Sequence, residues 1–249
     1  MSRAERIAGW LRDQAMHANA RGFVFGLSGG IDSALVARLC QLAAPQRVLG
    51  VYLPAYSHPG DEEDARLVAS TFSIPFARVD LTATFDAMSE ALDAGIKGLP
   101  HHVDVLDIKQ QLPDANIKPR LRMASLYFIA NSLNYLVAGT GNRSEILLGY
   151  FTKYGDGGVD LLPIARLLKS DVRALATELG VPARIIEKAP SAGLWMGQTD
   201  EEEMGFSYDA LEQYLEHGAG AVSPEVAQRI ERLRRTSEHK RNLPPMPPE

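Results

Sequence analysis

The most informative stretch of the chain combines two glycines with hydroxyl and carboxylate side chains. Mostly apolar, β-favouring residues from Phe23 to Leu27 run into Ser28-Gly-Gly-Ile-Asp-Ser33, and an apolar helical run follows. Glycine lets the backbone bend sharply and approach a ligand, and the free N–H groups at a helix N-terminus attract an anion. A strand, a tight turn and a helix start in this order therefore predict a phosphate-binding loop.

Two common phosphate-binding motifs do not match this loop. No Gly-Lys-Ser or Gly-Lys-Thr follows the glycines, so the loop is not a Walker motif, and the glycine spacing is not Gly-x-Gly-x-x-Gly. An ordinary Asp or Ser helix cap beside a glycine turn is the alternative interpretation. The complete six-residue string at a strand-to-helix junction favours nucleotide binding over that alternative.

The string from Ser28 to Ser33 resembles the pyrophosphate-binding loop of the ATP pyrophosphatases, enzymes that cleave ATP between its α and β phosphates. This resemblance implies that the hydroxyls of Ser28 and Ser33, together with backbone N–H groups, hold pyrophosphate. It also implies that Asp32 holds a magnesium ion.

A second strand-to-helix turn supplies a further carboxylate. Residues 136–140 are predicted as the fourth strand, and the string GTGNRSE from Gly139 to Glu145 leads into another helix. Thr140 offers a hydroxyl, and Glu145 can join Asp32 at one Mg²⁺, since two carboxylates with phosphate oxygens and water make an octahedral site. By itself, Glu145 can equally be a solvated acid in the first turn of a helix.

Loops further along the chain have the composition of ligand-binding segments. Residues 149–160 are rich in glycine and also hold two tyrosines, a lysine and two aspartates. Each glycine adds conformational entropy that is lost on folding, so this composition indicates a ligand-binding loop more than a simple connection. Lys169 and Asp171 then open another helix. Residues 188–195 are rich in small side chains, which suits a lid that closes over a ligand.

Strand and helix patterns alternate through the first half of the chain at the spacing of βαβ units. This pattern predicts an α/β fold with a doubly wound, parallel, five-stranded sheet, helices on both faces and a helical appendage at the C-terminal end. Ligands then bind at the carboxyl ends of the strands, where the glycine loop lies. The main expected strands are 23–27, 47–53, 76–81 and 136–140, and the main expected helices are 2–19, 61–72, 82–94, 116–135, 208–216 and 224–235.

The predicted helix from Asn116 to Tyr135 carries apolar residues around much of its circumference. It is therefore either a central core helix or half of a subunit interface, and the sequence leaves both open. Residues 95–113 before it are predicted to be irregular. His101 and His102 in that segment suggest a metal, but adjacent histidines without further ligands favour a surface loop.

The composition is that of an ordinary globular protein. The chain has 249 residues, 45% of them hydrophobic and 23% charged, and we expect one domain spanning 1–249. The net charge of −5 argues against a nucleic-acid surface. No apolar run approaches the roughly 18 residues of a membrane span, and the N-terminal segment does not resemble a signal peptide, so we expect a cytoplasmic protein with no membrane partner.

The single cysteine, Cys40, excludes an intrachain disulfide and a Cys-x-x-Cys metal site. It also leaves no cysteine that fits the nucleophile of a glutaminase, and the chain has no length for such a domain. We therefore expect free ammonia, or ammonia from a separate protein, as the nitrogen source of any amidation.

Several motifs together resemble those of the ammonia-dependent NAD synthetases, a family within the ATP pyrophosphatases. They are SGGIDS, NIKPRLRM, GTGNRSE, FTKYGDGGVDLLPI, KAPSAGLW, GQTDEEEMGFSY and SEHKR, and they extend over nearly the whole chain. The resemblance implies a homodimer of the adenine nucleotide alpha hydrolase-like fold whose substrates are deamido-NAD, ATP and ammonia, with Mg²⁺ as cofactor. Ser191 stands where some members have Thr, and the aspartate of their ADL tripeptide is missing here.

The same resemblance implies roles for individual residues. ATP would be bound by Gly26, Leu27, Ser28, Gly29, Gly30, Ile31, Asp32, Ser33, Thr140, Lys169 and Ser191. Mg²⁺ would be bound by Asp32 and Glu145. Deamido-NAD would be bound by Arg120, Lys153, Asp160, His239 and Lys240.

These residues suit the activation of a carboxylate. A carboxylate is a poor acyl donor because it is anionic and its leaving group would be oxide, and transfer of AMP onto it creates a mixed anhydride with a good leaving group. The hypothesis is that the nicotinate carboxylate of deamido-NAD attacks the α-phosphate of ATP, pyrophosphate leaves into the glycine loop, and ammonia then displaces AMP. Lys169 is the candidate for stabilising phosphate charge, and Asp156 is the candidate for holding ammonium or accepting its proton.

Two alternatives remain open at this point. One is an ATP pyrophosphatase that amidates or adenylates a different acceptor. The other is a non-catalytic adenine-nucleotide-binding protein with the same fold. The pair Asp32 and Glu145, with Lys153 and Lys169, argues against the second alternative, since binding alone would not require them.

Overall fold

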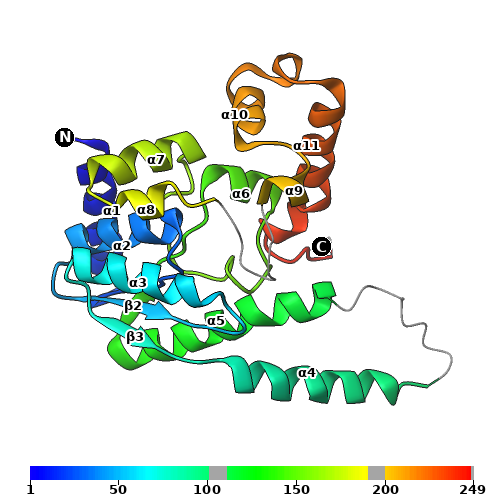
Figure 1. Ribbon diagram of the computed structural model, residues 1–249, viewed down its shortest axis with the longest axis horizontal. Coiled ribbons are helices and arrows are strands. Elements are labelled where there is room, and N and C mark those ends of the chain that lie inside the picture. The colour runs from blue at the N-terminus through cyan, green and yellow to red at the C-terminus, as the bar shows by residue number, and fades with distance from the viewer. Residues whose placement is uncertain (101–110, 190–199, 248–249) are drawn as a thin grey trace.

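The structure is a computed structural model that describes residues 1–100, 111–189 and 200–247 (Figure 1). Its centre is a parallel sheet of strand order β3-β2-β1-β4. The strands are β1 Gly22–Gly26, β2 Val48–Tyr52, β3 Phe76–Arg78 and β4 Tyr135–Val137. The reversal of strand order beside β1 places the end of β1 at the crevice where such sheets bind ligands.

The prediction of five strands was wrong for the described residues, where the sheet has four. The chain does return beside β4, but it forms one isolated parallel bridge between Ala138 and Leu161. The N–H of Leu161 donates to the carbonyl of Val137 at 3.2 Å, and the N–H of Gly139 donates to the carbonyl of Leu161 at 2.8 Å. Pairing does not continue because Pro163, two residues on, has no N–H to donate.

Helices cover both faces of the sheet, as predicted (Figure 1). Alternating side chains of β1 enter two separate cores, with Phe23 and Phe25 in one and Val24 in the other. The first core lies under α1 Arg3–His17, α2 Ile31–Ala43, α3 Pro59–Thr71, α7 Lys169–Glu178 and α8 Ala183–Ile186. The second lies under α5 Gln111–Leu133, and α4 Thr82–Lys97 packs against α5.

The C-terminal half of the long helix α5 is buried on one side only within this chain. Leu126 and Ala130 pack on the sheet, whereas Phe128 is 75% exposed. The helix starts earlier than the prediction of Asn116 and contains Pro119 in its interior. The sequence allowed a core helix or an interface helix, and the face that packs on the sheet is that of a core helix. His101 and His102 lie outside the described residues.

The predicted C-terminal appendage is a small helical layer with its own core (Figure 1). It consists of α6 Arg143–Leu148, α9 Asp200–Met204, α10 Tyr208–His217, α11 Pro224–Thr236 and the short 3₁₀ helices η1 Ala219–Ala221 and η2 Glu238–Lys240. Leu148, Tyr208, Leu211 and Ile230 pack together at its centre. Among the described helices, none is both long enough and apolar enough to cross a bilayer.

Candidate functional site

The glycine loop connects the end of β1 to the start of α2. Gly30 is the N-cap residue of α2 and supplies no side-chain cap, so the first N–H groups of the helix remain directed at the loop. The hydroxyl of Ser33 donates to the carbonyl of Gly30 at 2.9 Å and lies 3.1 Å from the hydroxyl of Ser28. Hydroxyl and amide donors therefore converge on one small volume, as anion binding requires.

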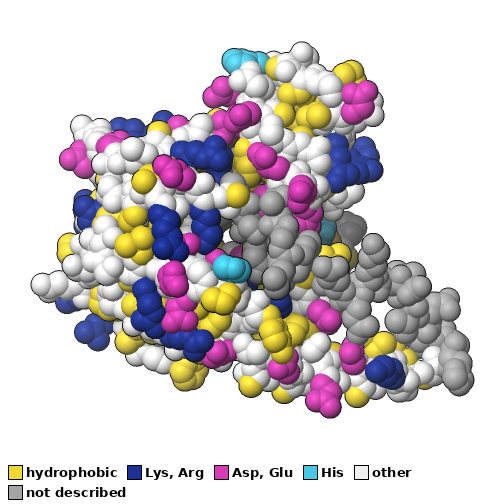
Figure 2. All heavy atoms as spheres, in the orientation of Figure 1, with side chains coloured by type: hydrophobic (Ala, Val, Ile, Leu, Met, Phe, Trp, Pro, Cys, Tyr) yellow, Lys and Arg dark blue, Asp and Glu magenta, His cyan; other side chains and the backbone are white. Residues whose placement is uncertain are grey.

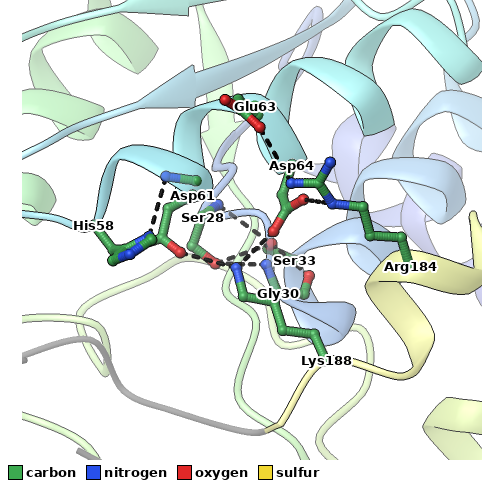
Figure 3. Close-up of polar contacts among 10 residues, drawn as sticks. Ser28, Gly30, Ser33, His58, Asp61, Glu63, Asp64, Arg184 and Lys188 are labelled. Atoms are coloured by element: carbon green, nitrogen blue, oxygen red, sulfur yellow. Dashed lines mark hydrogen bonds and ion pairs between the residues drawn. The ribbon is translucent and has the colours of Figure 1, made fainter. Parts of the chain in front are cut away.

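Gly29 is required by the geometry of this loop. Its φ of +79° is in the left-handed region, which side chains disfavour. A Cβ at this position would lie 2.7 Å from the carbonyl oxygen of Asp61 and 2.7 Å from the Cβ of Asp64. The loop is thus pressed against the first turns of α3, whose acidic residues are seen beside it in Figure 3.

Asp32, Lys169 and Glu145 meet beside the loop. The Nζ of Lys169, the first residue of α7, lies 2.5 Å from Oδ2 of Asp32, and Lys169 is only 2% exposed. Asn142, the N-cap of α6, joins the two carboxylates: its Nδ2 donates to Oδ1 of Asp32 at 3.1 Å and to Oε1 of Glu145 at 2.8 Å. Residues far apart in the sequence thus form one cluster.

The electrostatics of this cluster favour a cation. Burial, and then the charge of Asp32, raise the pKa of Glu145 well above its usual value. Burial opposes the charge on Lys169, but the carboxylates of Asp32 and Glu145 outweigh burial and raise the pKa of the lysine, which therefore stays protonated. Two carboxylates that repel each other across one cavity wall are a fitting donor pair for Mg²⁺.

The fit to Mg²⁺ depends on oxygens from outside the protein. In the described part of the chain, no group of three or more His, Cys, Asp or Glu side chains has the geometry of a metal site. A site built on Asp32 and Glu145 therefore needs phosphate oxygens and water to complete six ligands. This requirement suits an ion that arrives with a nucleotide.

A cavity of about 500 Å³ opens at the carboxyl ends of the strands. It is lined by most of the glycine loop and by the cluster around Asp32, and its far wall is formed by α5 and the glycine-rich segment 149–160. The predicted site residues on its wall are Gly26, Leu27, Ser28, Gly30, Ile31, Asp32, Ser33, Thr140, Glu145, Asp156, Lys169 and Lys240. Ser191 lies outside the described residues.

Asp156 faces the cavity from the glycine-rich segment. Its Oδ1 accepts the N–H of Thr152 at 2.9 Å. Enclosure by protein atoms raises the pKa of its carboxyl, and backbone N–H groups and the cations Lys240 and Arg122 act in the opposite direction. Asp156 is thus a buried carboxyl group on the cavity wall with two cations, Lys240 and Arg122, close to it. A carboxylate in the cavity can attract a small cation or accept a proton.

Four of the five predicted dinucleotide-binding residues lie close together, and of these four Lys240 lines the cavity. Nε of Arg120 on α5 is 3.4 Å from the carbonyl oxygen of Lys153, and Nζ of Lys153 donates to the carbonyl of His239 at 2.7 Å. Lys240, next to His239, donates to the carbonyls of Gly149 and Phe151, each at 2.8 Å. These contacts bring α5, segment 149–160 and η2 together.

Asp160 is placed differently from the other predicted dinucleotide-binding residues. Its Oδ1 accepts from the hydroxyl of Tyr127 at 3.0 Å, and its Oδ2 accepts from the N–H of Val137 at 2.8 Å. The carboxylate thus holds the end of β4 against α5, and it is not among the residues that line the cavity.

The sequence analysis missed several polar residues of the site. Among them, Arg122, Lys188 and Asp200 line the cavity. Asn142 is fully buried and joins Asp32 to Glu145. Asn142 has a recognisable signal, since Asn followed by Glu three residues later is a capping box. Asp200 is 4% exposed and accepts a hydrogen bond from the hydroxyl of Tyr208 at 2.9 Å. No local sequence pattern predicts this contact. Arg122 donates to the carbonyl of Leu53 at 2.9 Å from within a mostly apolar helix.

The fold and the site together define an α/β protein with a parallel sheet and a glycine loop that lines a cavity at the carboxyl ends of its strands. Residues 3–244 match the family model for NAD synthase, and the chain belongs to that family. The NH(3)-dependent NAD(+) synthetase of Carboxydothermus hydrogenoformans is 49% identical over 245 residues, which are 98% of this chain and 96% of that protein.

Solved structures agree with this assignment. The NMN synthetase from Francisella tularensis has a TM-score of 0.89 and 36% sequence identity, with 98% of this chain and 97% of that chain covered. The NAD+ synthetase from Burkholderia pseudomallei has a TM-score of 0.76 and 35% identity, with 97% and 90% covered.

Replacement of Gly29 by alanine tests the geometry of the loop. We expect Gly29→Ala to lower the free energy of unfolding by about 1–3 kcal/mol, because a Cβ is strained at this φ and collides with the backbone of α3. Gly30→Ala is the matched control, since its Cβ would meet only the Ser28 hydroxyl at 3.4 Å. Urea denaturation measures both, and equal stability of the two variants would contradict the structure.

Proposed function

We propose that this chain is a ligase that converts deamido-NAD to NAD with ammonia and ATP, releasing AMP and pyrophosphate. The observation that carries the proposal is the meeting of the glycine loop, the Lys169–Asp32 pair and Glu145 in one cavity. Relatives named NH(3)-dependent NAD(+) synthetase, which this chain matches over nearly their full length, support the choice of acceptor and of nitrogen donor. We also propose that residues 1–249 form one synthetase domain.

The proposed reaction has two steps. A carboxylate oxygen of the nicotinate attacks the α-phosphorus of ATP, the bond to the bridging oxygen breaks, and pyrophosphate leaves into the loop of Ser28 to Ser33. The nitrogen of ammonia then attacks the carboxyl carbon, AMP leaves with the bonding electrons, and the amide of NAD remains after loss of a proton.

The residues on the cavity wall have distinct proposed roles. The N–H and hydroxyl groups of Gly26 to Ser33 hold the phosphates, with Thr140 and Ser191 as further ATP contacts, and the Lys169 ammonium stabilises the charge that develops on them. Asp32 and Glu145 would hold Mg²⁺, which supplies additional charge neutralisation at phosphate oxygens when bound. Asp156 holds ammonium or accepts the proton that it loses.

We propose that deamido-NAD enters from the opposite wall of the cavity. Arg120, Lys153, His239 and Lys240 form a basic edge there, which suits the pyrophosphate of a dinucleotide. Asp160 is proposed as the remaining contact, and its bond to Val137 means that it would also hold the wall in place.

Product analysis tests the proposed function. The purified protein is incubated with Mg-ATP, either ammonium or glutamine, and either deamido-NAD or the corresponding mononucleotide, because one structural relative is named an NMN synthetase. We expect NAD and AMP in equal amounts from deamido-NAD with ammonium alone. AMP and pyrophosphate formed with another acceptor would assign a different substrate, and nucleotide binding without cleavage would indicate a binding protein.

Two variants separate the proposed catalytic roles. Lys169→Met should lower kcat by about 10²–10³-fold, the usual effect of removing one group that stabilises transition-state charge, with little change in the KM for ammonium. Asp156→Asn should instead raise the KM for ammonium. Steady-state kinetics measures both, and near-normal kcat in the first or unchanged ammonium dependence in the second would defeat that assignment.

We further propose a cytoplasmic homodimer. Exposed apolar side chains on α4 (Met88, Leu92, Ile96) and Phe128 on α5 support it, and Figure 2 shows hydrophobic side chains along the α4 edge. Light scattering should give about twice 27.2 kDa, and Phe128→Asp should shift the protein towards the monomer. A mass near 27.2 kDa for the unaltered protein would contradict the dimer, and cell fractionation tests the compartment.

A further inference from the structure

Lys188 makes a two-pronged ion pair beside the glycine loop. The residue follows α8, and its Nζ lies 2.8 Å from Oδ1 of Asp61 and 2.7 Å from Oδ2 of Asp64, both on α3. Figure 3 shows the lysine reaching across to these carboxylates next to Ser28 and Gly30, and Figure 2 shows basic side chains gathered where α8 meets α3.

The two carboxylates are not equivalent. The Asp64 side chain is 5% exposed and is also paired with Nε of Arg184 at 2.7 Å, so it keeps a cation if Lys188 is removed. The Asp61 side chain is 25% exposed and lines the cavity. Within the described ranges, the cation at salt-bridge distance from Asp61 is Lys188.

Asp61 is close enough to the loop to affect an anion bound there. Its carbonyl oxygen lies 2.7 Å from the position of a Cβ on Gly29, so the first turn of α3 and the loop are in contact. An unpaired carboxylate on the same cavity wall would repel a pyrophosphate group, and the repulsion would be only partly screened by salt.

We propose that Lys188 is a positioning residue. It neutralises the charge of Asp61 and holds the carboxylate of Asp61 beside that of Asp64, so that the pyrophosphate end of ATP can enter the glycine loop. This inference rests on the proposed binding of ATP by the loop. The geometry favours this role over direct phosphate binding, because Nζ already donates to two carboxylates at 2.7–2.8 Å and its departure would leave Asp61 unpaired beside the phosphates.

The test is a charge-removal and rescue experiment. Lys188→Met, which keeps the length of the side chain, should raise the KM for ATP at least 10-fold and leave the KM for deamido-NAD within 2-fold. Adding Asp61→Asn to this variant should restore the KM for ATP to within about 3-fold of the unaltered protein. Calorimetric binding of inorganic pyrophosphate should follow the same order, and added salt should reduce the defect of the single variant.

Matched variants exclude a general loss of stability. Arg66→Ala also removes one cation paired with an acid of α3, but outside the cavity, and should leave ATP binding unchanged. If Lys188→Met does not fold, Asp61→Asn alone serves as the test and should bind pyrophosphate at least as tightly as the unaltered protein, while Lys188→Arg should retain normal binding.

Three outcomes would overturn the inference: normal ATP binding in Lys188→Met, a double variant as weak as the single one, or weaker pyrophosphate binding in Asp61→Asn. The second would show that Lys188 touches the nucleotide itself. Failure of the proposed function is distinguishable, since unaltered protein that binds pyrophosphate but makes no NAD would leave the role of Lys188 intact.

Discussion

The ion pair between Lys169 and Asp32 is the interaction on which the site depends. It links the first residue of α7 to the first turn of α2, across 137 positions of sequence. A cation at a helix N-terminus is disfavoured by the helix dipole, and a buried lysine is disfavoured by desolvation. Both penalties are offset here because the carboxylates of Asp32 and Glu145 surround the lysine, and the same lysine allows those two carboxylates to lie close together.

This arrangement gives the cavity two walls of different character. On one side, the loop with its N–H groups and hydroxyls lines the cavity together with Lys169. On the other, Asp156 lies near Arg122 and Lys240, a carboxylate whose charge is supported by cations. One cavity therefore combines donor groups with a buried carboxylate, and the proposed reaction between ATP, a carboxylate and ammonia would use both.

Local patterns in the sequence predicted the parts of the site that a single strand-to-helix turn determines. The loop from Ser28 to Ser33, with Asp32 at the start of a helix, follows from glycine, an apolar strand and an apolar helix in series. The convergence of Glu145 with Asp32 followed from parallel topology, since both turns lie at the carboxyl edge of one sheet. Features that depend on contacts between distant segments were not predictable in this way.

Three examples show why. The pairing of Lys188 with Asp61 is set by how α8 packs beside α3, and no periodicity encodes it. The sheet was expected to have five strands, but Pro163 interrupts pairing after the single bridge at Leu161, so four strands form in the described residues. Both carboxylate oxygens of Asp160 accept hydrogen bonds, one from Tyr127 and one from Val137, and the first of these depends on the tertiary position of α5.

The contacts of Lys240 have a consequence for how the protein becomes active during synthesis. Its ammonium holds the carbonyls of Gly149 and Phe151, so the wall that carries Asp156 is braced by a residue made long after the glycine loop. Chains emerge from the ribosome N-terminal end first. The glycine loop is therefore made while the wall that carries Asp156 still lacks Lys240. The two walls of the cavity are therefore completed at different moments of translation, and the wall that carries Asp156 is completed last.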